Sequence, residues 1–159
     1  MEERTLVLIK PDGLWKSLTG NILTTFSEAR LKIVAAKIVK VDRNLAEKHY
    51  NNLREELKEK FGEEKGEKVY ENTMDYIQGK FHTDRVLALV YKGEDAIKKI
   101  RALAGATNPE KAEPHTIRGK YGRINSQTGV FETAVHCSDT PENAKREIAL
   151  WFDEKEIVE

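Results

Sequence analysis

The chain has 159 residues, which suits one ordinary domain and is long enough to bury a core without disulfides or metal ions. Basic and acidic residues are equal at 27 each, so the formal net charge is zero, which argues against general binding to nucleic acid or an anionic membrane. Cys137 is the only cysteine, which excludes an intrachain disulfide.

The first half of the chain alternates β-rich runs with helical patterns. The first apolar run is too short to span a membrane, and Met1–Arg4 shows no basic-then-apolar signal pattern, so we expect a cytoplasmic protein. The patterns predict a strand at 5–9, a turn at 10–13, a helix at 20–30, a strand at 31–41, a helix at 44–60, a polar break at 61–66 and a helix at 67–78.

The second half opens with a buried strand at 86–91 and a helix at 94–104. Residues 105–129 have little periodicity, and a structureless run of that length is usually functional or interfacial. A last strand is predicted at 129–136. Thr140 as the N-cap and Pro141 at the first helical position then predict a last helix that ends near Phe152.

This order, β-α-β-α-β-α-loop-β-α, contains no linker and no repeat, so we expect a single domain over residues 1–159. Four strands so spaced predict an α+β fold, a ferredoxin-like sandwich whose four-stranded antiparallel sheet has helices covering one face. A doubly wound parallel sheet is the alternative. It would usually offer a glycine-rich phosphate turn after its first strand, and neither GxGxxG nor GxxxxGK[ST] occurs.

His136 is the first candidate for chemistry, because it ends the last strand close to a helix N-terminus, where anionic groups bind well. A neutral imidazole is a competent nucleophile, and Glu147 on the last helix would reach back to orient the ring. The alternatives are a structural histidine and a solvated glutamate. Cys137 follows His136 directly, but neighbours on a strand point to opposite faces, so we do not expect a Cys–His pair.

Positive groups elsewhere suit phosphate. Lys10 ends the first strand, Arg101 lies on the helix after the third, and Arg118 lies in the long loop. Phosphoryl transfer requires mainly positioning and charge neutralisation, which arginine and lysine supply. Taken singly, each of these three residues would equally fit the alternative of an ordinary charged residue on the surface.

Several polar residues complete the candidate set. Thr107 follows the end of a helix, where its hydroxyl would bind a phosphate or where the segment is only a C-cap and turn. Tyr50 would form a hydrogen bond near the histidine or pack as a half-buried tyrosine in the core. Asp12 and Asp139 would support a divalent cation through water. Two separated carboxylates indicate that any Mg²⁺ arrives with nucleotide phosphates.

Taken together, these pieces resemble the nucleoside diphosphate kinase family over nearly the whole chain. The matching stretches, in the family's order, lie at residues 4–13, 31–34, 46–50, 105–109, 116–119, 136–139 and 147–152. The resemblance implies a ferredoxin-like fold and a ping-pong reaction. A nucleoside triphosphate would phosphorylate His136, and a nucleoside diphosphate would then accept the phosphoryl group.

By matching position, the resemblance also implies roles for individual residues. Ser138 and Glu147 would support the histidine, and Mg²⁺ would bridge the nucleotide phosphates. Broad base and sugar specificity and a homo-oligomer, a tetramer or hexamer built from dimers, are implied as well. The residues that would bind phosphates and ribose or line that site are Lys10, Tyr50, Arg101, Thr107 and Arg118.

The chain departs from the family pattern in places. Thr133 replaces the usual asparagine, which shortens the side chain and removes an amide donor. The segment 51–80 is longer than usual, which leaves Phe61 and Tyr70 as candidates for the aromatic that stacks on the base. Ser17 and Arg30 replace common glycines. Two alternatives therefore stand beside an active kinase: a non-catalytic or weakly active nucleotide-binding member, and a small ferredoxin-like interaction domain.

Overall fold

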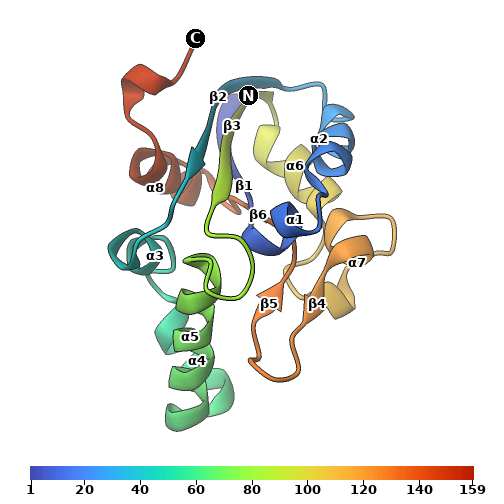
Figure 1. Cartoon of the computed structure of the whole chain (residues 1–159). Helices are drawn as coiled ribbons and strands as arrows, with labels where there is room; N and C mark the ends of the chain where they lie inside the picture. Colours follow the sequence, from blue (N-terminus) through green and yellow to red (C-terminus); the bar gives the residue numbers. More distant parts are fainter.

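The computed structural model describes residues 1–159 and contains one four-stranded sheet (Figure 1). Its strands lie in the order β2-β3-β1-β6, and every neighbouring pair is antiparallel. This arrangement confirms the predicted α+β, ferredoxin-like fold. No helix combines the length and the apolar character needed to cross a membrane. The strands are β1 (Glu2–Ile9), β2 (Lys32–Val39), β3 (Val86–Glu94) and β6 (Val135–Cys137).

Helices and a small hairpin surround the sheet. The hairpin pairs β4 (Arg123–Ile124) with β5 (Phe131–Glu132). Two short 3-10 turns, η1 (Pro109–Lys111) and η2 (Glu154–Glu156), complete the fold. The helices are α1 (Pro11–Trp15), α2 (Thr19–Ser27), α3 (Arg43–His49), α4 (Leu53–Phe61), α5 (Glu63–Ile77), α6 (Ala96–Ala104), α7 (Ile117–Tyr121) and α8 (Pro141–Trp151).

Helices cover both faces of the sheet, so the prediction that they cover only one is wrong. Leu6 and Leu8 of β1 pack in one core with α8. Val7 and Ile9 point the other way and pack in a second core with α2 and α6, which contribute Phe26 and Ile100. The physical reason is the unbroken apolar run of β1, because a strand buried on both faces has no polar positions to alternate.

The segment from residue 44 to 78 folds differently from the prediction. The helix expected over 44–60 divides, since α3 ends at His49 and α4 begins at Leu53. The break expected at 61–66 shrinks to Gly62, whose φ of +88° turns the chain directly into α5. Gly66 lets α5 approach α4 closely, because a Cβ there would lie 2.5 Å from the Cα of Lys58. The hairpin α4–α5 extends away from the sheet (Figure 1).

The region from residue 105 to 136 also departs from the prediction. The expected loop contains η1, α7 and β4, and the expected single strand at 129–136 is two strands, β5 and β6. Ala134, with φ +64°, turns the chain between them. The turn is held by the backbone N–H of Lys10, which donates to the Ala134 carbonyl at 2.7 Å, and by Asp12 Oδ2, which accepts from Ala134 N at 2.9 Å.

Asp12, which the sequence suggested would support a divalent cation through water, has a structural role. It is fully buried, and its second oxygen accepts the hydroxyl of Tyr76 from α5. Ser17 and Arg30 adopt φ of +57° and +54°, so these turns keep a left-handed geometry without glycine.

We predict that Tyr76→Phe lowers the free energy of unfolding by about 2 kcal/mol, because it leaves one oxygen of the buried Asp12 without its donor. Urea unfolding measures the change. Tyr91→Phe is the control, since Tyr91 is a buried residue whose hydroxyl makes no hydrogen bond within the protein, and it should change stability by less than about 0.5 kcal/mol. Equal losses in the two variants would contradict this account of Asp12.

Candidate active site

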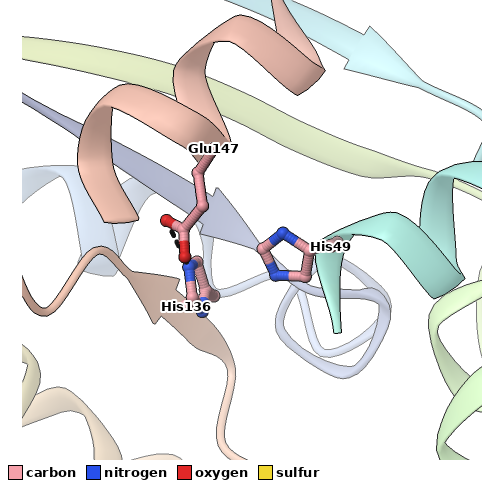
Figure 2. A group of neighbouring side chains, drawn as sticks. All are labelled: His49, His136 and Glu147. Carbon is pink, nitrogen blue, oxygen red and sulfur yellow. Dashed lines mark hydrogen bonds and ion pairs between the residues drawn. The ribbon is translucent and has the colours of Figure 1, made fainter. Parts of the chain in front are cut away.

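His136 occupies the middle of β6, where it pairs with Leu8 of β1. Cross-strand partners share a face of the sheet, so the imidazole lies on the side covered by α8. Its side chain is 22% exposed, which leaves the ring accessible. Glu147 of α8 reaches the ring as predicted, with Oε2 3.0 Å from His136 Nε2 (Figure 2).

Glu147 is itself fixed by a second donor. Its buried Oε2 accepts the hydroxyl of Ser138 at 2.7 Å, and the Ser138 oxygen accepts from the backbone N–H of Leu6 at 3.1 Å. An ionised carboxylate only accepts hydrogen bonds, so we assign the ring proton of His136 to Nε2. The Nδ1 atom then carries a free lone pair, the state that a nucleophilic imidazole requires.

A second histidine lies against the first, and the sequence analysis missed it. His49 is buried, and its ring stands edge-on to that of His136 with centroids 4.5 Å apart (Figure 2). Burial, followed by the proximity of His136, lowers its pKa well below the usual value, so His49 stays neutral. In the sequence, His49 occupies an apolar position of a helical pattern, which indicates a core residue. The available signal was its place beside Tyr50, in a stretch that matches the family.

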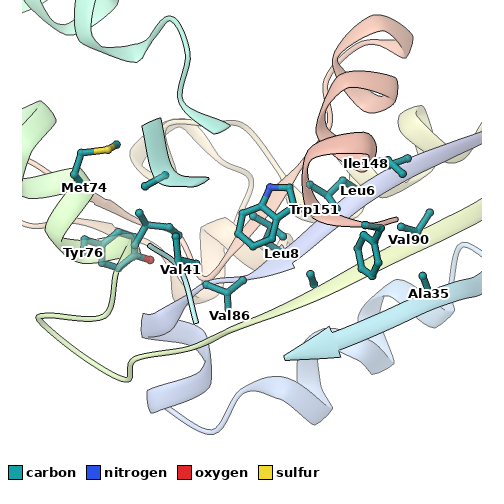
Figure 3. Packing of buried hydrophobic residues seen from close by; sticks show 14 of the residues in the cluster. Leu6, Leu8, Ala35, Val41, Met74, Tyr76, Val86, Val90, Ile148 and Trp151 are labelled. Carbon is teal, nitrogen blue, oxygen red and sulfur yellow. The ribbon is translucent and has the colours of Figure 1, made fainter. Parts of the chain in front are cut away.

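Trp151 holds His49 in place. Its indole N–H donates to His49 Nδ1 at 3.1 Å, and the indole packs in the core over β1 (Figure 3). Ligand atoms of His49, His136 and Glu147 lie within 4.8 Å of one another, a spacing open to a metal ion. In this structure hydrogen bonds join His136 to Glu147 and His49 to Trp151 instead.

A cavity of about 280 Å³ opens in front of His136. It gathers six of the seven residues predicted to bind nucleotide, from separate parts of the chain. Those six are Lys10, Tyr50, Phe61, Thr107, Arg118 and Thr133. The sequence analysis did not single out Glu56, Lys60 or Phe131, which line it too.

Lys10 and Arg118 are the buried cations of this cavity. The Lys10 ammonium donates to Thr133 Oγ1 at 2.8 Å and to the Phe131 carbonyl at 3.1 Å. Burial is the main reason that the pKa of Lys10 falls to about 8. Arg118 donates to the carbonyls of Gly105 and Val135, at 2.8 and 3.3 Å, while its buried Nε–H has no partner.

Of the two aromatic residues predicted as candidates for stacking on the base, only one lies in the cavity. Phe61 lines it, whereas Tyr70 packs in the core beneath the guanidinium groups of Arg43 and Arg54. Lys60 Nζ lies 5.0 Å from the centre of the Phe61 ring and 5.5 Å from that of Phe131. Tyr50 terminates α3, and burial raises the pKa of its hydroxyl.

Two predicted residues lie outside the cavity lining. Arg101 is half-buried on α6 and lines a separate depression beside Pro141. Asp139 is exposed and accepts from Asn143 Nδ2 at 2.7 Å, a bond that lowers the pKa of its carboxyl group. Cys137 lies on the opposite face from His136, in the core of α2 and α6, and so makes no Cys–His pair.

A histidine with a fixed tautomer, facing a cavity that contains buried cations, defines a phosphoryl-transfer site. The comparisons agree with this class. The family model for nucleoside diphosphate kinase matches residues 3–157. The chain therefore belongs to the nucleoside diphosphate kinase family, whose members are phosphotransferases.

The relatives that support this assignment match along nearly their full lengths. The chain is 39% identical to a nucleoside diphosphate kinase of Carboxydothermus hydrogenoformans, over 98% of this chain and 91% of the relative. It is 41% identical to that of Pyrococcus furiosus, over 99% and 87%.

Solved structures give the same result. An NDP kinase from Pyrobaculum aerophilum superposes with a TM-score of 0.85 at 31% identity and covers all of both chains. A transition-state mimic of the Borrelia burgdorferi enzyme, with bound vanadate and ADP, superposes with a TM-score of 0.83 at 32% identity. The match covers 99% of this chain and 91% of that one.

Proposed function

We propose that this chain, as a single domain, transfers the γ-phosphoryl group of a nucleoside triphosphate to a nucleoside diphosphate, with His136 as the phosphorylated intermediate. The observation that carries the proposal is the hydrogen bond from His136 Nε2 to Glu147, which leaves Nδ1 free beside a cavity that contains Lys10 and Arg118.

In the first half-reaction, the lone pair of His136 Nδ1 attacks the γ-phosphorus. The bond from that phosphorus to the β–γ bridging oxygen breaks, and its electron pair leaves with the nucleoside diphosphate. The imidazole gains positive character as the N–P bond forms, and the Glu147 carboxylate stabilises it through the Nε2–H. A second nucleoside diphosphate then attacks the phosphohistidine in the reverse direction.

The cations neutralise the phosphate charge that moves in this step. The partnerless Nε–H of Arg118 is a buried donor without an acceptor, which suits a phosphate oxygen. The Lys10 ammonium supplies a point charge, and Thr107 adds a hydroxyl at the rim. Arg101 would approach from α6, since its charge already acts on Cys137 and Asp139.

Ribose and base would occupy the outer part of the cavity. Tyr50 and Thr133 offer hydroxyls to the sugar and phosphates, and Phe61 offers a ring face to the base. Because stacking is tolerant of base identity, this arrangement supports broad base specificity.

The cavity fits Mg²⁺ that arrives on the nucleotide. Glu56 is the only carboxylate among its lining residues, so there is no protein cage of the kind that a resident divalent ion needs. The nucleotide phosphates would hold the ion, with Asp139 as a ligand through water. When bound, Mg²⁺ neutralises charge on the transferring phosphates.

We further propose a homo-oligomer, a tetramer or hexamer built from dimers, in the cytoplasm. The edge strand β2 supports the oligomer, because Ile33 and Ile38 on it are 51% and 57% exposed. An unpaired apolar edge is a ready surface for pairing with a second copy.

We predict that wild-type protein incubated with γ-labelled ATP and Mg²⁺ acquires an acid-labile label and passes it to dTDP. His136→Ala should abolish both, because the nucleophile is gone. His115→Ala is the matched control, since His115 is exposed in the loop before α7 and should leave labelling unchanged. An unlabelled wild type, or a labelled His136→Ala variant, would refute the proposal.

We predict that Thr133→Val raises the KM for nucleoside triphosphate about tenfold, because Lys10 loses a hydrogen-bond acceptor inside the cavity. Thr133→Ser keeps the hydroxyl and should stay close to the wild type. Steady-state kinetics measures both, and an unchanged KM in the valine variant would contradict this role.

The same position tests the alternative of a weakly active member. Thr133→Asn would raise turnover severalfold if threonine limits this chain. Unchanged turnover would count against Thr133 as the cause of any weak activity.

A further inference from the structure

Glu132 is a buried carboxylate that the proposed reaction does not use. It lies on β5 and is 1% exposed. A buried ionised group requires partners, and Glu132 has several. Its Oε1 accepts from Arg123 Nε and Nη2 at 3.1 and 3.0 Å and lies 3.2 Å from His82 Nε2, while its Oε2 accepts from Asn125 Nδ2 at 2.8 Å.

These partners keep the carboxylate charged. Burial by itself would raise the pKa of Glu132, but the hydrogen bonds from Asn125 and Arg123 together hold it below its usual value. Glu132 is therefore an anion at neutral pH, enclosed between the β4–β5 hairpin and the segment that follows α5.

The network joins the β4–β5 hairpin to a segment that is distant in sequence. Arg123 belongs to β4, and His82 lies in the loop between α5 and β3, close to the ring of Trp15. Asn125 organises the hairpin turn, because its Oδ1 accepts from the backbone N–H of Gln127 at 3.0 Å. Glu132 thereby fixes the position of β5 relative to the rest of the site.

The residues on both sides of Glu132 hold Lys10. The carbonyl of Phe131 and the hydroxyl of Thr133 are the two hydrogen-bond acceptors of the Lys10 ammonium. Any shift of β5 would therefore move both acceptors of the Lys10 ammonium together.

We propose that Glu132 is a positioning residue, which anchors β5 so that Phe131 and Thr133 hold the Lys10 ammonium where nucleotide phosphates bind. The inference rests on the proposed function, in which Lys10 binds phosphate. Glu132 acts through Lys10 and does not touch the substrate.

The charge of Glu132 has a second effect on Lys10. Burial lowers the pKa of Lys10 most, Arg118 lowers it further, and Asp12, Glu132 and Cys137 raise it, with a net value of about 8. Removal of the Glu132 charge lowers this pKa further, so the ammonium would lose its proton at a lower pH. Nucleotide binding that depends on the Lys10 charge would then weaken at a lower pH than in the wild type.

The test is the affinity for Mg²⁺-free ADP, measured by calorimetry from pH 6 to pH 9 in Glu132→Gln, which keeps the side-chain shape and removes its charge. We expect about tenfold weaker binding at neutral pH and an alkaline limb displaced to lower pH. Glu28→Gln, an exposed carboxylate on the chain segment that follows α2, is the control and should match the wild type.

Arg123→Gln provides a variant that folds readily, because the Arg123 side chain is 58% exposed. It should weaken ADP binding in the same direction by a smaller factor, and it decides the question if Glu132→Gln does not fold. If the folded variants keep the ADP affinity of the wild type and the same alkaline limb in its pH profile, the inference is overturned, even if their thermal stability falls. Failure of the wild type to form phosphohistidine would refute the proposed function alone, since ADP affinity is measured without transfer.

Discussion

The site depends on one hydrogen bond, between His136 on β6 and Glu147 on α8. The bond exists because α8 begins only a few residues after β6. Its start is defined by Thr140, whose side chain accepts from Asn143 N at 3.1 Å, and by Pro141. The helix then returns over β1 and places the buried Glu147 above the histidine ring. Ser138 links that carboxylate to the backbone of β1, so the acceptor has little freedom to move.

The cations of the cavity are also held by fixed hydrogen-bond acceptors. Arg118 is anchored on two carbonyls and Lys10 on the Phe131 carbonyl and the Thr133 hydroxyl. Such groups are in place before a nucleotide arrives, so little reorganisation is required when charge moves during transfer. The chain turns at Ala134, between β5 and β6. The residues before this turn hold Lys10, and the strand after it carries His136.

The sequence predicted the elements whose signal is local. The N-cap at Thr140 and the strand at β3 followed from short patterns, and the family resemblance brought together Lys10, Arg118 and Glu147. The site residues that the sequence did not predict are those whose positions depend on contacts between distant parts of the fold. His49 fits an apolar helical position, and only the tertiary structure places it against His136. Glu132 meets His82 across fifty residues of chain, which no spacing rule reveals. The continuous apolar run of β1 did carry the signal for a sheet covered on both faces.

The central claim is that Glu147 holds the Nε2 proton of His136 and so leaves Nδ1 as the nucleophile. The most direct measurement is the position of the phosphoryl group on the ring, determined by ¹H–¹⁵N and ³¹P NMR of protein phosphorylated with ATP and labelled with ¹⁵N at histidine. We expect phosphorus to be bonded to Nδ1 of His136, with Nε2 still protonated. Phosphorus on Nε2, or on His49 instead of His136, would contradict it.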